Sequence, residues 1–194
     1  DEIVLTSGKS YSNVFHANGG SAAFSVMANT LRGVYGTDVL LATANSFTGS
    51  VLKADYTQKM AASMIMPNGL LAYRRTMTGA ELKETVRAFV EGCEGGFVPF
   101  NRGSLPVFSG IAVEVKEDSG SYTLTGITRN GQPLGDNDTV TVTCLATAKQ
   151  MAPLLADKSD ISMDGDAWVK NTWRDYVSGG KAVLAEPENY MTLR

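Results

Sequence analysis

Hydrophobic and polar residues alternate along the second half of the chain, and this pattern predicts antiparallel strands. The run from Ile111 to Val115 places apolar side chains on one face and a charged residue on the other, as in a strand with one buried face. Asn130 and Gly131 are the pair that a tight hairpin turn prefers, because both tolerate a positive φ. A second alternating run, from Thr139 to Leu145, sets valines and Cys144 against threonines. The sequence therefore predicts a sheet in this region.

The first half of the chain shows helical periodicity and one continuous apolar run. Ser21 suits the N-cap of a helix that ends at Gly33, and its apolar face comprises Phe24, Met27, Ala28 and Leu31. The run from Thr37 to Ala44 does not alternate, which is typical of a strand buried on both faces. A Met- and Ala-rich stretch from Thr57 to Met66 predicts a second helix, and Leu70 to Thr76 a strand.

The strongest local signal is a capping box at residues 78–81. Thr78 and Glu81 have the spacing at which the hydroxyl accepts from the N3 amide and the carboxylate accepts from the N-cap amide. A helix is predicted from Gly79 to its end at Gly92.

The last third reads as a loop, Lys149 to Gly165, followed by a helix that starts at Asp166 and presents Val169, Trp173, Tyr176 and Val177 on one face. No repeat or proline-rich linker divides the chain. We therefore predict one mixed α/β domain of the α+β class over residues 1–194, with residues 1–20 leading into a core at 21–194.

Composition narrows the function by exclusion. With 194 residues, 43% of them hydrophobic, the chain can bury one core. A net charge of −3 gives no field that gathers a phosphate backbone, so nucleic acid is not expected as a partner. No apolar run reaches the 18 or so residues of a membrane span, and Asp1 to Thr6 lacks the features of a signal peptide.

The chain contains a single histidine, His16, and two cysteines. None of the companion spacings of zinc or di-metal hydrolases surrounds His16, so we expect no catalytic residue and no metal site in this chain. Cys93 and Cys144 lie too far apart in the sequence for a CxxC motif. Cys144 is expected to pack inward. The sequence leaves open whether the two cysteines form one disulfide.

The loop from Asn45 to Ser50 is the most interesting candidate for ligand binding. It leaves the end of a strand predicted to be buried, where open α/β sheets tend to place ligands. Its small polar residues and single aromatic, Phe47, suit stacking on a planar group, although a plain loop explains the same residues.

Several of these segments resemble the C-terminal domain of the bacterial 5'-nucleotidase family, which includes UDP-sugar hydrolases and 2',3'-cyclic phosphodiesterases. Residues 77–83 are similar to that family's helix start, and residues 106–111 and 127–134 to its later strand and hairpin. Residues 37–45 are similar to the strand that ends in the family's Asn-Gly-Gly loop. The resemblance runs from about Gly20 to the C-terminus.

The resemblance implies a non-catalytic domain that binds the nucleoside part of a substrate during nucleotide catabolism. The family's chemistry belongs to a separate N-terminal metallophosphoesterase domain with two divalent metal ions, so that domain is the implied partner and no cofactor is implied here. The family's location outside the cytoplasm, in the periplasm, at the cell surface or secreted, is implied as well.

The ligand loops depart from the family pattern. Asn45 is kept, but Ser46 and Phe47 replace the two glycines, and Asn68 lies where a Pro-Phe-Gly-Asn motif is expected. Asn45, Phe47 and Asn68 are therefore the candidate substrate-binding residues. A binding or structural module that kept the fold and lost nucleotide recognition is the alternative.

Overall fold

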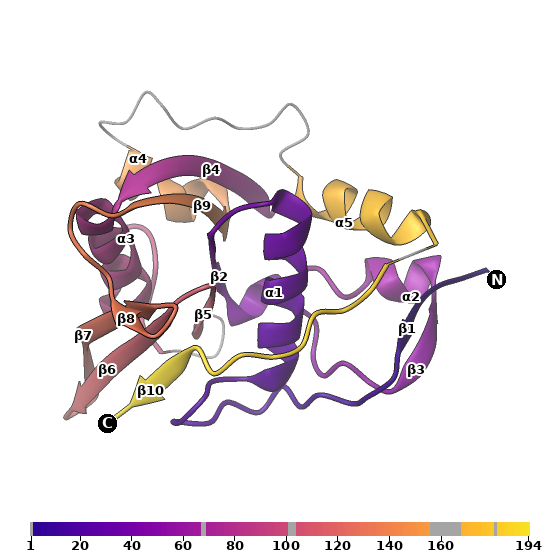
Figure 1. Ribbon diagram of the computed structural model, residues 1–194, viewed down its shortest axis with the longest axis horizontal. Coiled ribbons are helices and arrows are strands. Elements are labelled where there is room, and N and C mark those ends of the chain that lie inside the picture. The colour runs from indigo at the N-terminus through magenta and orange to yellow at the C-terminus, as the bar shows by residue number, and fades with distance from the viewer. Residues whose placement is uncertain (1, 67–68, 101–103, 156–167, 181) are drawn as a thin grey trace.

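A computed structural model describes residues 2–66, 69–100, 104–155, 168–180 and 182–194. Its described residues form two four-stranded sheets and one two-stranded sheet, packed with helices (Figure 1). The predicted α+β class is confirmed. The helices are α1 (Ala22–Tyr35), α2 (Gln58–Ala62), α3 (Gly79–Glu91), α4 (Ala148–Leu155) and α5 (Val169–Ser178), with the 3-10 turn η1 (Ala44–Ser46). The strands are β1 (Ile3–Ser7), β2 (Val39–Thr43), β3 (Ala54–Thr57), β4 (Leu71–Thr78), β5 (Pro106–Ser109), β6 (Ala112–Asp118), β7 (Ser121–Arg129), β8 (Gln132–Pro133), β9 (Thr139–Ala146) and β10 (Met191–Leu193).

The central sheet has the order β4-β9-β2-β5 and is mixed. Strand β2 runs parallel to β9 and antiparallel to β5, while β4 runs antiparallel to β9. All five residues of β2 are buried, as the continuous apolar run predicted. Helix α1 packs on β2 and β5. Because β2 and β9 are parallel, their carboxyl ends lie at one edge of this sheet.

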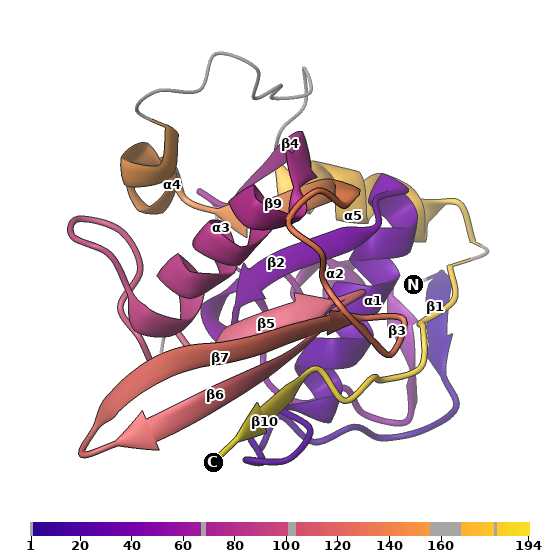
Figure 2. The same ribbon diagram turned by 60° about the vertical axis from the view of Figure 1, so that its left-hand side comes forward.

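The second sheet has the order β10-β6-β7-β8, and its β6–β7 hairpin extends beyond the central sheet (Figure 2). Val113 and Val115 are buried while Glu114 and Lys116 are exposed, so the predicted alternation is confirmed. Asn130 and Gly131 have φ values of 53° and 76°, as the tight turn requires. Helix α3 packs against β7.

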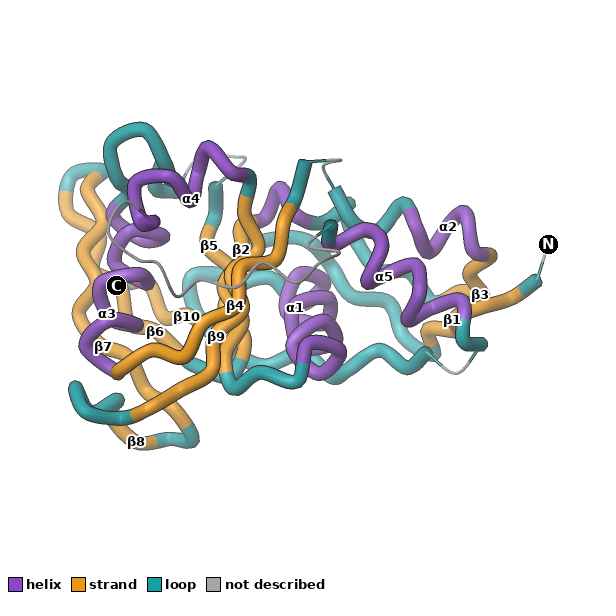
Figure 3. The backbone as a smooth tube through the Cα atoms, turned by 90° about the horizontal axis from the view of Figure 1, so that it is seen from above, coloured by secondary structure: helices purple, strands orange, loops and turns teal. Residues whose placement is uncertain are grey.

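The third unit pairs β1 antiparallel with β3 and lies beside α2 and α5 at the opposite end of the molecule from α3, β6 and β7 (Figure 3). Val4 and Leu5 of β1 are buried in the common core. The residues that we predicted as a lead-in are thus part of the packed structure.

Two predicted helix starts are confirmed, and one predicted end is wrong. Ser21 accepts a hydrogen bond from the amide of Phe24 at the start of α1, and both hydrogen bonds of the Thr78–Glu81 capping box are present. Helix α1 continues past Gly33 to Gly36, whose φ of 64° permits the left-handed cap.

The structure corrects four other predictions. The stretch from Thr57 to Met66, predicted as one helix, holds only the short helix α2, which follows strand β3. Lys149, predicted as the first residue of a loop, lies inside helix α4. Helix α5 starts at Val169 with Trp168 as its N-cap residue, whereas Asp166 lies outside the described residues. Thr143, predicted to face outward, is fully buried, and its hydroxyl is hydrogen-bonded to that of Thr37 at 3.0 Å.

Candidate functional site

The carboxyl end of β2 carries the predicted ligand loop. Asn45 lies in the 3-10 turn η1 directly after β2, its side chain is exposed, and its Oδ1 accepts a hydrogen bond from the hydroxyl of Thr43. The neighbouring Ser46 is fully buried, and its hydroxyl has no hydrogen-bond partner among the described residues. An exposed amide and a buried unpaired hydroxyl thus stand next to each other at this edge of the sheet.

Phe47 lies in the core. Its side chain is 5% exposed, and its ring packs against that of Phe24 with the centroids 6.0 Å apart. A ring buried this deeply would have to leave the core before it could stack on a ligand. Asn68 lies outside the described residues. The assignment of Asn45, Phe47 and Asn68 to a substrate site stays a prediction.

Two residues that we did not predict for the site reach the same edge. The amide of Met66 donates to the carbonyl of Ser46 at 2.9 Å. Trp168 forms an antiparallel bridge with Leu71, the first residue of β4, which in turn pairs with Ala146 at the carboxyl end of β9. Both side chains are exposed, Met66 at 46% and Trp168 at 47%. The sequence offered no signal for this, because both residues lay in or next to predicted helices.

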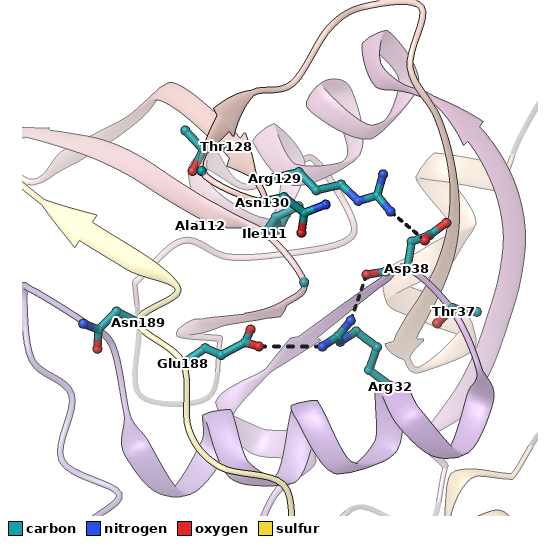
Figure 4. Close-up of a pocket in the computed structure, with 12 residues that line it drawn as sticks. Arg32, Thr37, Asp38, Ile111, Ala112, Thr128, Arg129, Asn130, Glu188 and Asn189 are labelled. Carbon is teal, nitrogen blue, oxygen red and sulfur yellow. Dashed lines mark hydrogen bonds and ion pairs between the residues drawn. The ribbon is translucent and has the colours of Figure 1, made fainter.

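A second feature is a charged cleft of about 390 Å³ at the opposite, amino end of β2 (Figure 4). It lies where α1, the start of β2, the β7–β8 turn and the segment before β10 meet, and its charged lining residues are Arg32, Asp38, Arg129 and Glu188. The four charges sum to zero, so the cleft has no net attraction for an ion of either sign.

Asp38 is the centre of the cleft's hydrogen bonds. One carboxylate oxygen accepts from Arg129 at 2.6 Å, and the other accepts from the amide and the hydroxyl of Thr141, both at 2.9 Å. Arg32 donates through Nε to the hydroxyl of Ser109 at 2.7 Å and lies 3.7 Å from Glu188. These contacts join α1 and both four-stranded sheets, so we interpret the cleft as a structural junction.

Asp38 also makes a pH prediction possible. The hydrogen bond from the Thr141 amide, helped by the Thr141 hydroxyl and Arg129, holds the pKa of Asp38 below its ordinary value of 3.8, although burial opposes this. A depressed pKa adds stability that is present above pH 3.8 and is lost as the pH falls through the lower pKa of the folded state. In denaturant melts at pH values from about 2 to about 7, Asp38→Asn should therefore flatten the acid arm of the stability curve.

The control for this prediction is the difference in the free energy of unfolding between Asp38→Asn and the unmodified chain at each pH. Glu81, whose pKa is lowered by the hydrogen bond from the Thr78 amide, contributes acid sensitivity to both. Parallel curves for Asp38→Asn and the unmodified chain would show that Asp38 is not stabilised in the folded state.

The described residues hold no group of three or more His, Cys, Asp or Glu side chains that could bind a metal ion. Both cysteines are free, which answers the question of a bridge between them. Cys144 is buried, as predicted, and burial raises its pKa to about 12. Among the described helices, none is long and apolar enough to cross a membrane.

No protein-family model and no curated protein sequence matches this chain. Solved structures do match it over its whole length. The chain is similar to a 5'-nucleotidase precursor from Thermus thermophilus (15% identity, TM-score 0.70, 39% of that chain) and to the NAD nucleotidase NadN from Haemophilus influenzae (18%, 0.69, 38%). It is also similar to the sulfate thiohydrolase SoxB from Thermus thermophilus (12%, 0.65, 35%).

These matches define the class of the protein as an α+β domain with the fold found in 5'-nucleotidase structures. The resemblance to the C-terminal domain of that family is confirmed at the level of the fold. The chain spans between 35% and 39% of each of these structures. A neighbour named for a sulfate thiohydrolase has the same fold, so the fold by itself does not fix the substrate.

Proposed function

We propose that this chain is the substrate-binding, non-catalytic domain of a larger 5'-nucleotidase-like metallophosphoesterase that acts in nucleotide catabolism. The observation that carries the proposal is that the whole chain matches about two fifths of two nucleotidase structures.

In this proposal the two divalent metal ions and the hydrolytic step belong to a separate N-terminal domain of the same protein. The present chain contributes by holding the nucleoside part, with Asn45 and Asn68 as hydrogen-bonding candidates, so that the phosphate reaches the metals in a fixed position. We also propose a location outside the cytoplasm, which follows from the resemblance to this family.

A second candidate is a module that kept the fold and lost nucleotide recognition. The burial of Phe47 against Phe24 favours it, because the one aromatic in the candidate loop is used by the core.

Calorimetric titration with adenosine, AMP and UDP-glucose separates the two candidates. Saturable binding of at least one ligand supports the substrate-binding domain, and no binding across the set supports the diverged module. The isolated chain is also expected to release no phosphate from AMP with Mg²⁺, Mn²⁺, Co²⁺ or Zn²⁺. Turnover that copurifies with the chain through two columns would contradict a non-catalytic role.

A further inference from the structure

Another cleft, of about 310 Å³, lies between helix α3 and strand β7, which run beside each other (Figure 2). One wall consists of Lys83 and Arg87 on α3 and the other of residues 124–127 of β7, and Pro133 and Leu134 complete the lining. Both charged lining residues are cations, whereas the charges of the cleft at the amino end of β2 sum to zero. The cleft between α3 and β7 is therefore largely apolar, with positive charge along one wall.

The two cations keep hydrogen-bonding capacity for a ligand. The Lys83 ammonium, which can donate three hydrogen bonds, donates one to Asp136 at 2.6 Å. Asp136 is 71% exposed, so this is a surface contact that a ligand can replace at little cost. Arg87 Nε lies 3.7 Å from Glu91 Oε1, and Arg87 donates no hydrogen bond within the described part of the chain. Because residues four apart on a helix have Cβ atoms about 5–6 Å apart, one carboxylate can contact both cations.

The β7 wall of the cleft offers backbone groups as well. Strand β8 pairs with only two of the nine residues of β7, so β7 is the edge of the sheet along the cleft. Val115, the partner of Leu124 on β6, accepts from the amide of Arg194 on its other side, so the backbone groups of Leu124 point away from β6. The Leu124 amide donates to Glu91 at 2.9 Å. Its carbonyl has no partner among the residues that the structure describes.

An extended acidic peptide fits this combination better than an inorganic anion does. Unpaired backbone groups at a sheet edge are a template for one further strand. The apolar lining gives peptide side chains a surface to cover, which a phosphate or sulfate would leave unused. Charge complementarity requires a carboxylate opposite Lys83 and Arg87. Since alternate side chains of a strand share a face, the apolar side chains belong two positions before and after the acidic one.

We propose that the cleft between α3 and β7 is the docking site for an extended segment of a partner protein that carries one acidic residue with apolar residues two positions away on each side. The segment pairs with the edge of β7 at the Leu124 carbonyl, and its carboxylate lies between Lys83 and Arg87. The inference goes beyond the proposed function and does not depend on it, because the cleft lies on the second sheet, whereas Asn45 follows a strand of the central sheet.

The probe is the peptide Val-Thr-Glu-Thr-Val, labelled with a dye at its N-terminus and amidated at its C-terminus, and its binding to the chain is followed by fluorescence anisotropy. We expect saturable binding, which Arg87→Gln and replacement of the peptide Glu by Gln should each weaken about tenfold. The two changes together should cost little more than either alone, because they remove the same contact. Arg174→Gln is the matched control and should change nothing, since Arg174 is also a helical arginine beside an acidic residue, with 51% of its side chain exposed against 53% for Arg87.

Methylation of the peptide nitrogens tests the strand pairing. A strand pairs with β7 through one of its edges, so methyl groups on the alternate nitrogens of that edge should abolish binding. Methyl groups on the other edge should leave the affinity within about threefold.

No saturable binding of the Glu peptide overturns the proposal, and so does unchanged affinity in both Lys83→Gln and Arg87→Gln. Equal tolerance of methyl groups on both edges, or displacement of the peptide by an equal concentration of acetate, would indicate a simple anion site and overturns it as well. Denaturant unfolding checks the fold of each variant, and the Gln peptide, which leaves the protein unchanged, decides the question if a variant unfolds. The nucleoside titrations are read separately, so this proposal and the proposed function can each fail alone.

Discussion

Replacing Trp173 by alanine is expected to lower the free energy of unfolding by about 3–5 kcal/mol. Trp173 is fully buried, and its indole N–H donates to the carbonyl of Ala61 at 2.7 Å. This hydrogen bond joins α5 to the end of α2 across 112 residues of sequence. The truncation would leave a large cavity and would remove one hydrogen bond from the Ala61 carbonyl, which keeps the bond from the Met64 amide at 3.1 Å. Denaturant unfolding measures the sum of the two losses.

Trp173→Phe is the matched control for this prediction. It keeps most of the packing and removes the hydrogen bond, so it should cost much less than alanine, on the order of 1–2 kcal/mol. If the two substitutions were equally mild, Trp173 would not be the residue that holds α5 against α2. The Trp168→Ala variant, at the exposed N-cap position of the same helix, gives the baseline for a substitution outside the core.

Features that depend on neighbouring residues were predictable from the sequence. The Thr78–Glu81 capping box, the Asn130–Gly131 turn and the buried strand β2 all lie where the pattern placed them. Each is determined by residues a few positions apart, so the side chains that set the conformation are next to each other in the sequence. The end of α1 at Gly36 is the exception, because two glycines three residues apart both suit a left-handed cap.

Features that depend on distant residues were not predictable. Phe47 has the sequence context of a loop aromatic, yet it is buried because Phe24 of α1 packs against it. The cleft around Asp38 requires Arg129 and Thr141, which are 91 and 103 residues away. Trp168 reaches the edge that carries Asn45 only because the start of α5 pairs with the start of β4. The hydrophobic periodicity of the sequence predicts none of these contacts, because each joins residues that are far apart in the chain.

The two ends of β2 therefore have different roles in the structure. The charged groups at the amino end, around Asp38, already bind one another and join the two larger sheets. At the carboxyl end, Asn45 and Trp168 expose polar and aromatic surface along the same sheet edge, and Ser46, buried next to Asn45, has a hydroxyl without a hydrogen-bond partner in the described part of the chain. A bound ligand replaces water most favourably where surface is apolar and hydrogen-bonding groups are available, so the carboxyl end is the better place to search for one.

The junction at the amino end leads to the second large effect, which is expected for Gly110→Ala. Gly110 lies between β5 and β6 with a φ of 81°, and an added Cβ would be 2.1 Å from the carbonyl oxygen of Asp38. That oxygen belongs to the backbone, so it can only move together with the start of β2. We expect a loss of about 2–4 kcal/mol, from the left-handed backbone and from the overlap with Asp38.

Gly131→Ala separates the two causes, because Gly131 has nearly the same φ, 76°, and no atom within 4 Å of an added Cβ. It should cost only the backbone contribution, roughly 1 kcal/mol. The excess in Gly110→Ala then measures how rigidly the two larger sheets are joined at Asp38. Equal losses in the two variants would mean that the junction yields to the extra methyl group. A larger loss for Gly110→Ala, reduced when Asp38→Asn has already loosened the junction, would show that the two residues act on the same contact.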